Sequence, residues 1–359
     1  MPVLTPTASD RLSLLRFPLI VGVVFIHAYA TTVQTAGAQI GSSQLHPAAA
    51  LFIEMLSQGV ARSAVPCFFL VAGLLYFWGL PAGVSPHAPK WRTRVRTLLL
   101  PYLFWNLLSA GLFALAQSLP ATRAYFSGAQ TPIAELSTLE FLAGLFGVGR
   151  APFSYPFWFI RDLMLLVLAA PLLGLLLRRL GAPLLVALFG AWLLWPGLSM
   201  LPSLEALAWF ALGAWLGLRE REPFPPASWL AGLLLAYAFA LPLVVAGPWP
   251  QARPWLHQGL VALGVAAALA ATAWLVTRPR WRAALLQLAP ASFFVYAAHE
   301  PLLTVARKLS YRLLQPEHSL LLLTLYLAVP LAVIGVLLLL RAALQRLLPG
   351  PLAWVSGGR

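Results

Sequence analysis

Long apolar runs, separated by short segments that contain charges, proline or glycine, repeat along the whole chain. A run of about 20 apolar residues is long enough to cross a bilayer as a helix. Only 9% of the residues are charged and 60% are hydrophobic, whereas a soluble domain carries about 25% charged residues. The sequence therefore predicts an all-α, polytopic integral membrane protein rather than a soluble one.

Ten of these runs are predicted to be transmembrane helices of a single domain over residues 1–359. They cover about residues 12–33, 52–79, 98–118, 156–177, 183–197, 203–218, 228–247, 257–277, 289–311 and 319–341. The runs at 183–197 and 203–218 are short for a hydrocarbon core of about 30 Å. They fit two tilted or broken crossings or one re-entrant hairpin, so nine or eight crossings stay open beside ten.

The cations predict the orientation, because lysine and arginine accumulate in cytoplasmic loops. With the N-terminus inside, the cytoplasmic segments contain Arg11, Lys90, Arg92, Arg94, Arg96, Arg178, Arg179, Arg219, Arg221, Arg278, Arg280, Arg282, Arg341, Arg346 and Arg359. The outer segments contain Arg123, Arg150, Arg253, Arg307, Lys308 and Arg312. Both termini are thus predicted to be cytoplasmic. The same bias accounts for the net charge of +14, so no nucleic-acid partner is expected.

The single cysteine, Cys67, excludes an internal disulfide and a multi-cysteine metal site. No metal site is predicted elsewhere. Cys67 lies in the apolar run Val65-Pro-Cys-Phe-Phe-Leu-Val, where a small buried side chain is the expected role and a nucleophile is not.

Four ionisable residues fall near the middle of predicted spans: His27, Arg62, His299 and Glu300. Such groups are costly in a bilayer and are functional candidates by default. A mid-helix histidine is also compatible with an interhelical hydrogen bond, and Arg62 with Glu300 is compatible with a structural ion pair. A buried polar centre at mid-depth is the simplest arrangement that lets all four satisfy one another.

Arg16 and His27 are eleven residues apart, which is three helical turns to within about 20°. They are therefore predicted to share one helix face, with Arg16 about 16 Å nearer the cytoplasm. This spacing suits a long substrate with an anionic head. Arg92, Arg94 and Arg96 add cations on the same side, and arginine pairs bidentately with phosphate, although these three also fit the cytoplasmic charge bias alone.

Five segments, taken in order, resemble the membrane-bound acyltransferase 3 family. They are Arg16 followed after ten residues by His27, Val65-Pro-Cys-Phe-Phe-Leu-Val-Ala-Gly73, Arg94-Val-Arg-Thr-Leu-Leu-Leu-Pro-Tyr-Leu-Phe-Trp105, Phe157-Trp-Phe-Ile-Arg-Asp162 and Ser292-Phe-Phe-Val-Tyr-Ala-Ala-His-Glu-Pro301. The sequence departs from the family at Ala72, where many relatives carry serine. Its arginine-rich segment is also looser than the family's double-arginine form, so which of Arg94 and Arg96 contacts the donor stays open.

The resemblance implies an O-acyltransferase that takes an acyl group, with acetyl as the first expectation, from cytoplasmic acyl-CoA to a hydroxyl of an envelope or exported carbohydrate. His27 is then the general base, with Arg16 on the donor side. Arg94 and Arg96 are expected to bind the donor's phosphates. The residues expected to contact substrate or the oxyanion are Arg62, Trp158, Arg161, His299 and Glu300.

The expected reaction is direct transfer in a ternary complex, because no convincing nucleophile accompanies His27. No bound cofactor is expected, and acyl-CoA is expected as a co-substrate. The expected location is a bacterial inner membrane. The alternative is a proton-coupled transporter or flippase for a glycan, which also needs mid-membrane His, Arg and Glu. The sequence does not indicate the oligomeric state.

Overall fold

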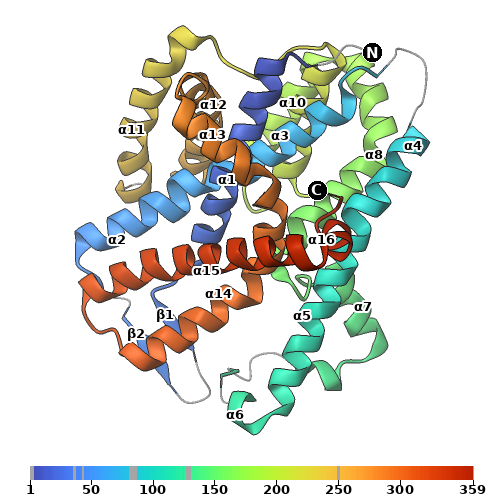
Figure 1. Cartoon of the computed structure of the whole chain (residues 1–359). Helices are drawn as coiled ribbons and strands as arrows, with labels where there is room; N and C mark the ends of the chain where they lie inside the picture. Colours follow the sequence, from blue (N-terminus) through green and yellow to red (C-terminus); the bar gives the residue numbers. More distant parts are fainter. Residues whose placement is uncertain are drawn as a thin grey trace. The chain divides into compact units, whose positions relative to one another are not determined.

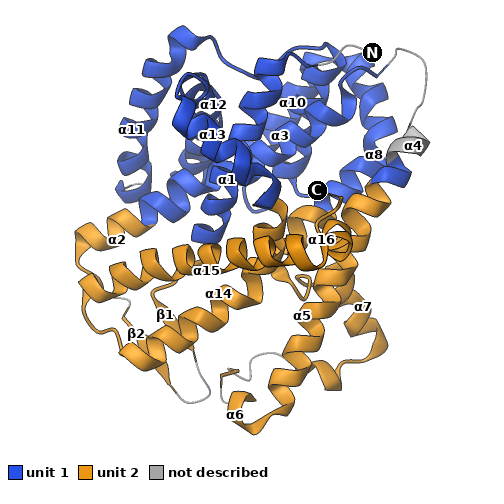
Figure 2. Cartoon of the chain, viewed as in Figure 1, with its two compact units in different colours: residues 1–26, 54–93, 162–292 blue, residues 27–53, 94–161, 293–359 orange. Residues whose placement is uncertain are grey.

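A computed structural model describes residues 4–34, 38–42, 44–80, 87–123, 125–126, 131–248 and 251–358, without the side chains of residues 87–90. Arg359 and the side chain of Lys90, both counted above as cytoplasmic cations, lie outside this description. The chain divides into two compact units (Figure 2). Unit 1 comprises residues 1–26, 54–93 and 162–292, and unit 2 comprises residues 27–53, 94–161 and 293–359.

The described chain is overwhelmingly helical (Figure 1). Elements mainly in unit 1 are α1 (Pro6–His27), η1 (Met55–Gly59), η2 (Val60–Ser63), α3 (Ala64–Phe77), α4 (His87–Arg94), α8 (Trp158–Leu180), α9 (Ala182–Leu194), α10 (Leu204–Leu218), η6 (Ala227–Trp229), α11 (Leu230–Ala246), α12 (Arg253–Val276), α13 (Pro279–Leu288) and η7 (Ala289–Ala291). Here η marks a short 3₁₀- or π-helical segment.

Elements mainly in unit 2 are β1 (Thr32–Gln34), β2 (Gln39–Gly41), α2 (Pro47–Glu54), η3 (Val95–Leu99), α5 (Leu100–Ser118), α6 (Pro120–Arg123), η4 (Ile133–Glu135), α7 (Thr138–Phe146), η5 (Tyr155–Phe157), α14 (Ser292–Leu314), α15 (Ser319–Leu347) and α16 (Pro349–Val355). The two strands form an antiparallel hairpin with Thr32 opposite Gly41. This hairpin is the one departure from an all-α fold among the described residues.

Six helical stretches within the described ranges are long and apolar enough to cross a membrane. They are Pro47–Phe77, Trp91–Ser118, Tyr155–Leu180, Ala227–Ala246, Arg253–Val276 and Ser319–Leu347. The predicted short spans correspond to α9 and α10, which are apolar but short. The protein is thus a multi-pass membrane protein, whereas the expected count of ten and the side of each terminus stay predictions.

The first helix differs from the predicted span 12–33 at both ends. It begins at Pro6 and ends at His27, and the chain then turns into β1. Hydropathy could not locate this end, because Ala28, Tyr29 and Ala30 continue the apolar run. His27 therefore lies at a helix end, where the last carbonyls lack intrahelical partners.

Close packing of α3 on α10 forms the core of unit 1. A Cβ atom at Gly73 would lie 2.1 Å from the carbonyl oxygen of Phe210, and one at Gly213 would lie 1.9 Å from that of Leu70. Small residues let helix backbones approach closely in membranes, where van der Waals packing drives association. These glycines therefore set the distance between the two helices.

Candidate active site

His27 lies among three polar side chains of unit 2, and these four residues are called the His27 cluster. Its imidazole stacks on that of His299, with ring centroids 5.3 Å apart and an interplanar angle of 25°. Its edge meets the ring of Tyr155 at 4.8 Å and 83°. The hydroxyl of Tyr155 donates to Oε1 of Glu300 at 3.1 Å. Three segments far apart in sequence thus form one polar group.

The backbone of α14 is broken at Glu300, which has non-helical angles of φ −108° and ψ 136°. Pro301 follows it, and a proline disfavours the helical region for the preceding residue and supplies no N–H to the helix. Oε2 of Glu300 accepts a hydrogen bond from the backbone N–H of Thr304 at 3.4 Å. The His-Glu-Pro sequence therefore supplies two polar side chains at a helix break.

Buried hydrogen bonds position Tyr155, the first residue of η5. Oδ1 of Asn106, on α5, accepts from the backbone N–H of Ser154 at 3.0 Å, and Asn106 is fully buried. The hydroxyl of Tyr296 donates to the carbonyl oxygen of Pro156 at 2.7 Å. The segment that carries Tyr155 is therefore fastened on both sides to helices of unit 2.

Arg307, on α14, binds the end of α1. Its guanidinium donates to the carbonyl oxygen of His27 at 3.4 Å and also to that of Ala30. A cation at a helix C-terminus satisfies free carbonyls and interacts favourably with the helix dipole. Arg307 thus fixes the backbone from which the His27 ring projects.

The His27 cluster combines buried and accessible groups. His299 has no exposed surface and Glu300 is 5% exposed, whereas Tyr155 is 39% exposed and His27 is half-buried. Nδ1 of His299 lies 2.6 Å from the carbonyl oxygen of Tyr296. A carbonyl only accepts, so Nδ1 carries the proton and a neutral His299 has its lone pair on Nε2. That atom is buried and has no hydrogen-bond partner among the described residues.

Trp158 and Arg161, both expected at the site, lie at the start of α8 in unit 2. Trp158 is half-buried. Nη1 of Arg161 donates to the carbonyl oxygen of Gly147, the residue in left-handed conformation that ends α7. Arg161 therefore has a visible structural contact, and its substrate role stays a prediction.

The remaining predicted cations are divided between the units. Arg16 lies on α1 in unit 1, half-buried, and shares this helix with His27. Arg62 is in η2 of unit 1, where it donates to Oε1 of Gln58 at 2.8 and 2.6 Å. In unit 2, Arg94 ends α4 and the exposed Arg96 lies in the π-helical η3. Arg62 and Glu300 belong to different units, so their pairing stays a prediction.

Sequence reasoning missed Tyr155, Arg307 and Asn106. From the sequence, Arg307 is predicted only as an outer cation, and Tyr155 is not singled out. One available signal was the polar Asn106 inside an apolar span.

Cys67 is fully buried. Within the described ranges, no three His, Cys, Asp or Glu side chains gather closely enough to hold a metal ion.

Comparison with known proteins identifies the family to which this chain belongs. A family model described as an acyltransferase domain matches residues 9–341. A similar protein is the succinoglycan biosynthesis protein ExoH of Rhizobium meliloti (strain 1021), with 28% identity over 98% of this chain and 92% of ExoH. No solved structure matches the chain.

The chain belongs to the acyltransferase 3 family, since the family model covers nearly its whole length. It is therefore a membrane O-acyltransferase, and the resemblance drawn from the five ordered segments is confirmed. Family membership favours the enzyme over the transporter alternative.

Proposed function

We propose that this protein transfers an acyl group, acetyl in the first instance, from cytoplasmic acyl-CoA to a hydroxyl of an exported or cell-envelope polysaccharide at a bacterial inner membrane. The observation that carries the proposal is the His27 cluster within a chain of the acyltransferase family. The relative named for succinoglycan biosynthesis supports a polysaccharide acceptor.

His27 acts as the general base. As the acceptor hydroxyl attacks the thioester carbonyl carbon, an imidazole nitrogen takes the hydroxyl proton, which is a role suited to histidine near neutral pH. The tetrahedral oxyanion collapses to the ester and expels the CoA thiolate, which receives the proton from His27. One C–O bond forms, one C–S bond breaks, and the protein returns to its starting state.

Neighbouring groups have separate roles in this proposal. Arg307 and His299 fix the position of the His27 ring, and Tyr155 presents an accessible surface beside it. Nε2 of a neutral His299 offers an acceptor for a substrate hydroxyl, so oxyanion stabilisation falls first to donors such as the indole N–H of Trp158. Arg62, Arg161 and Glu300 remain substrate candidates. Arg16, Arg94 and Arg96 bind the donor's phosphates, for which arginine forks are suited.

The test uses the full chain in lipid nanodiscs, acetyl-CoA with a labelled acetyl group, and deacylated succinoglycan as the acceptor. Free CoA thiol and polysaccharide-bound label are expected to appear together. Thiol release without label on the polysaccharide would disprove transfer to it. Label bound to the protein after donor alone would disprove direct transfer and indicate a covalent intermediate.

A further inference from the structure

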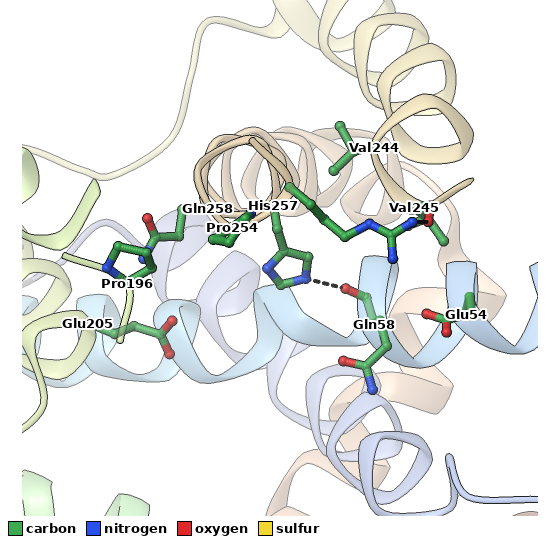
Figure 3. A pocket seen from close by; sticks show the side chains of 10 residues that line it. Glu54, Gln58, Pro196, Glu205, Val244, Val245, Pro254, His257 and Gln258 are labelled. Atoms are coloured by element: carbon green, nitrogen blue, oxygen red, sulfur yellow. Dashed lines mark hydrogen bonds between the residues drawn. The ribbon is translucent and has the colours of Figure 1, made fainter. Parts of the chain in front are cut away.

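A cavity of about 500 Å³ lies within unit 1 (Figure 3). Its polar lining consists of Glu54, Gln58, Glu205, Arg253, His257 and Gln258, and valine and proline side chains complete the wall. These six residues define the His257 cavity. In the close-up, His257 lies between Gln258 and Glu205 on one side and Gln58 and Glu54 on the other. None of these six residues belongs to the His27 cluster.

The cavity is built where several helices begin or end. Glu54 and Gln58 lie at the junction of α2 and η1, Glu205 lies in the first turn of α10, and Arg253 begins α12. The orientation predicted from the cation bias places each of these helix ends on the outer side of the membrane. An exported polysaccharide is accessible on that side, whereas cytoplasmic acyl-CoA is not.

Several lining groups are already held in place. Nε2 of His257 lies 2.6 Å from the carbonyl oxygen of Gln58, so it donates there. The side-chain oxygen of Gln58 accepts two hydrogen bonds from Arg62. Arg253 donates to the carbonyl oxygen of Val245 at 2.8 Å. A preorganised lining loses less conformational entropy when a ligand binds.

Besides the preorganised lining, the side chain of Gln258 indicates that the cavity binds a ligand. Its side chain is 8% exposed, and its Oε1 is buried with no hydrogen-bond partner among the described residues. Leaving a buried acceptor without a hydrogen-bond donor costs free energy, because the oxygen loses its hydrogen bonds to water. An O–H or N–H donor on a bound molecule would remove this cost.

The charges and hydrogen-bonding groups of the lining indicate which class of ligand the cavity binds. Two carboxylates against one guanidinium disfavour phosphates, and therefore the CoA donor. An ammonium group donates hydrogen bonds but accepts none, so it leaves the amide and guanidinium donors unmatched. A sugar hydroxyl both donates and accepts. We infer that the His257 cavity binds a neutral sugar residue of the acceptor, an inference that rests on the proposed function.

The test measures equilibrium binding to the full chain in nanodiscs by titration calorimetry, without any acyl donor. The probes are cellotetraose, maltotetraose, glucose and putrescine. At least one neutral tetrasaccharide is expected to bind, and Gln258→Met and Glu205→Gln are each expected to weaken it about tenfold, the effect of one lost hydrogen bond of about 1.4 kcal/mol. Binding of glucose alone would assign the cavity to a free sugar and overturn the acceptor role.

The matched controls are Gln287→Met and Glu220→Gln, which change exposed residues of the same unit. Both variants are expected to bind the tetrasaccharide with the affinity of the unchanged protein. Thermal unfolding verifies that each variant folds. Unchanged affinity in both cavity variants, or binding of putrescine without either tetrasaccharide, would overturn the inference. If sugar binding behaves as expected but no CoA thiol is released with deacylated succinoglycan, the proposed function fails and the sugar site stands.

Discussion

The His27 cluster of unit 2 and the His257 cavity of unit 1 both place a histidine among polar groups, but they hold it differently. His27 contacts aromatic and imidazole rings and is half-buried. His257 donates to a backbone carbonyl and faces carboxylates, amides and a guanidinium. A ring left accessible beside a few rigid neighbours suits proton transfer, whereas many convergent hydrogen-bonding groups suit recognition of a ligand.

The largest expected effect separates the two sites directly. His27→Ala removes the proposed base, so kcat is expected to fall about 1000-fold, within the range for general-base catalysis, while tetrasaccharide affinity stays unchanged. Thiol release and calorimetry measure the two quantities. The control His318→Ala changes an exposed histidine of unit 2. Full activity in His27→Ala would remove the catalytic role from the cluster.

Arg16→Ala tests the donor side. Loss of a guanidinium–phosphate contact is expected to raise the KM for acetyl-CoA about 10- to 150-fold, since charge-assisted hydrogen bonds contribute about 1.5–3 kcal/mol, with little change in the KM for polysaccharide. Arg280→Ala, at an exposed position of unit 1, serves as the control. Equal rises in both KM values would show that Arg16 is structural.

Gly73→Ala tests whether the unit that contains the cavity depends on close helix packing. The added Cβ would overlap the carbonyl oxygen of Phe210, so a loss of about 1–3 kcal/mol in stability is expected from overpacking. The matched control is Gly232→Ala on α11, where a Cβ meets nothing within 4 Å. Thermal unfolding in nanodiscs compares them, and equal midpoints would contradict the packing argument.

Tyr155→Phe tests the accessible edge of the His27 cluster. The variant keeps the ring against His27 but removes the hydroxyl that donates to Glu300, so kcat is expected to fall about tenfold through one lost hydrogen bond of about 1.4 kcal/mol. Tyr125→Phe, whose hydroxyl accepts from Arg312 instead, is expected to keep wild-type kcat. A change in tetrasaccharide affinity rather than kcat would reverse the assignment of roles.

The smallest effect is expected at the start of α7, where Ser137 and Glu140 form a capping box. Ser137 donates hydrogen bonds to Glu140 and holds the pKa of its carboxyl below the ordinary value. A lowered folded-state pKa contributes stability above the ordinary pKa, and this contribution is lost as pH falls through the lowered value. Ser137→Ala should therefore lower the unfolding midpoint slightly at neutral pH and less in acid.

Neither site is expected to respond to the loss of this cap. Glu135→Gln, at an exposed position two residues earlier, provides the comparison for the unfolding midpoint. A changed kcat or tetrasaccharide affinity in Ser137→Ala would show that α7 contributes to one of the sites.

Much of the His27 cluster could be anticipated from the sequence, because a charge or imidazole inside an apolar run is costly and therefore conspicuous. His27, His299 and Glu300 were found this way. Tyr155 and Arg307 were not, since a tyrosine near a span end and an arginine in a predicted outer segment are both common in membrane proteins. Their roles depend on contacts between segments far apart in the chain.

The His257 cavity, in contrast, could not be predicted from the sequence. Glu205, His257 and Gln258 lie near the ends of predicted spans, where polar residues need no special explanation. Neither periodicity nor hydropathy predicts that the ends of α10 and α12 and the junction of α2 and η1 line one cavity, because both patterns describe one helix at a time.

The amino-acid sequence by itself determined the membrane class, the approximate helices, the family and the three inward polar residues His27, His299 and Glu300, because desolvation cost and helix length act locally along the chain. Only the tertiary structure decided that α1 ends at His27, that Tyr155 and Arg307 join that residue, and that Gln258 has an unmatched oxygen in a polar cavity. These three features depend on which helix ends lie next to one another. Side-chain packing between segments far apart in the chain determines which ends do so.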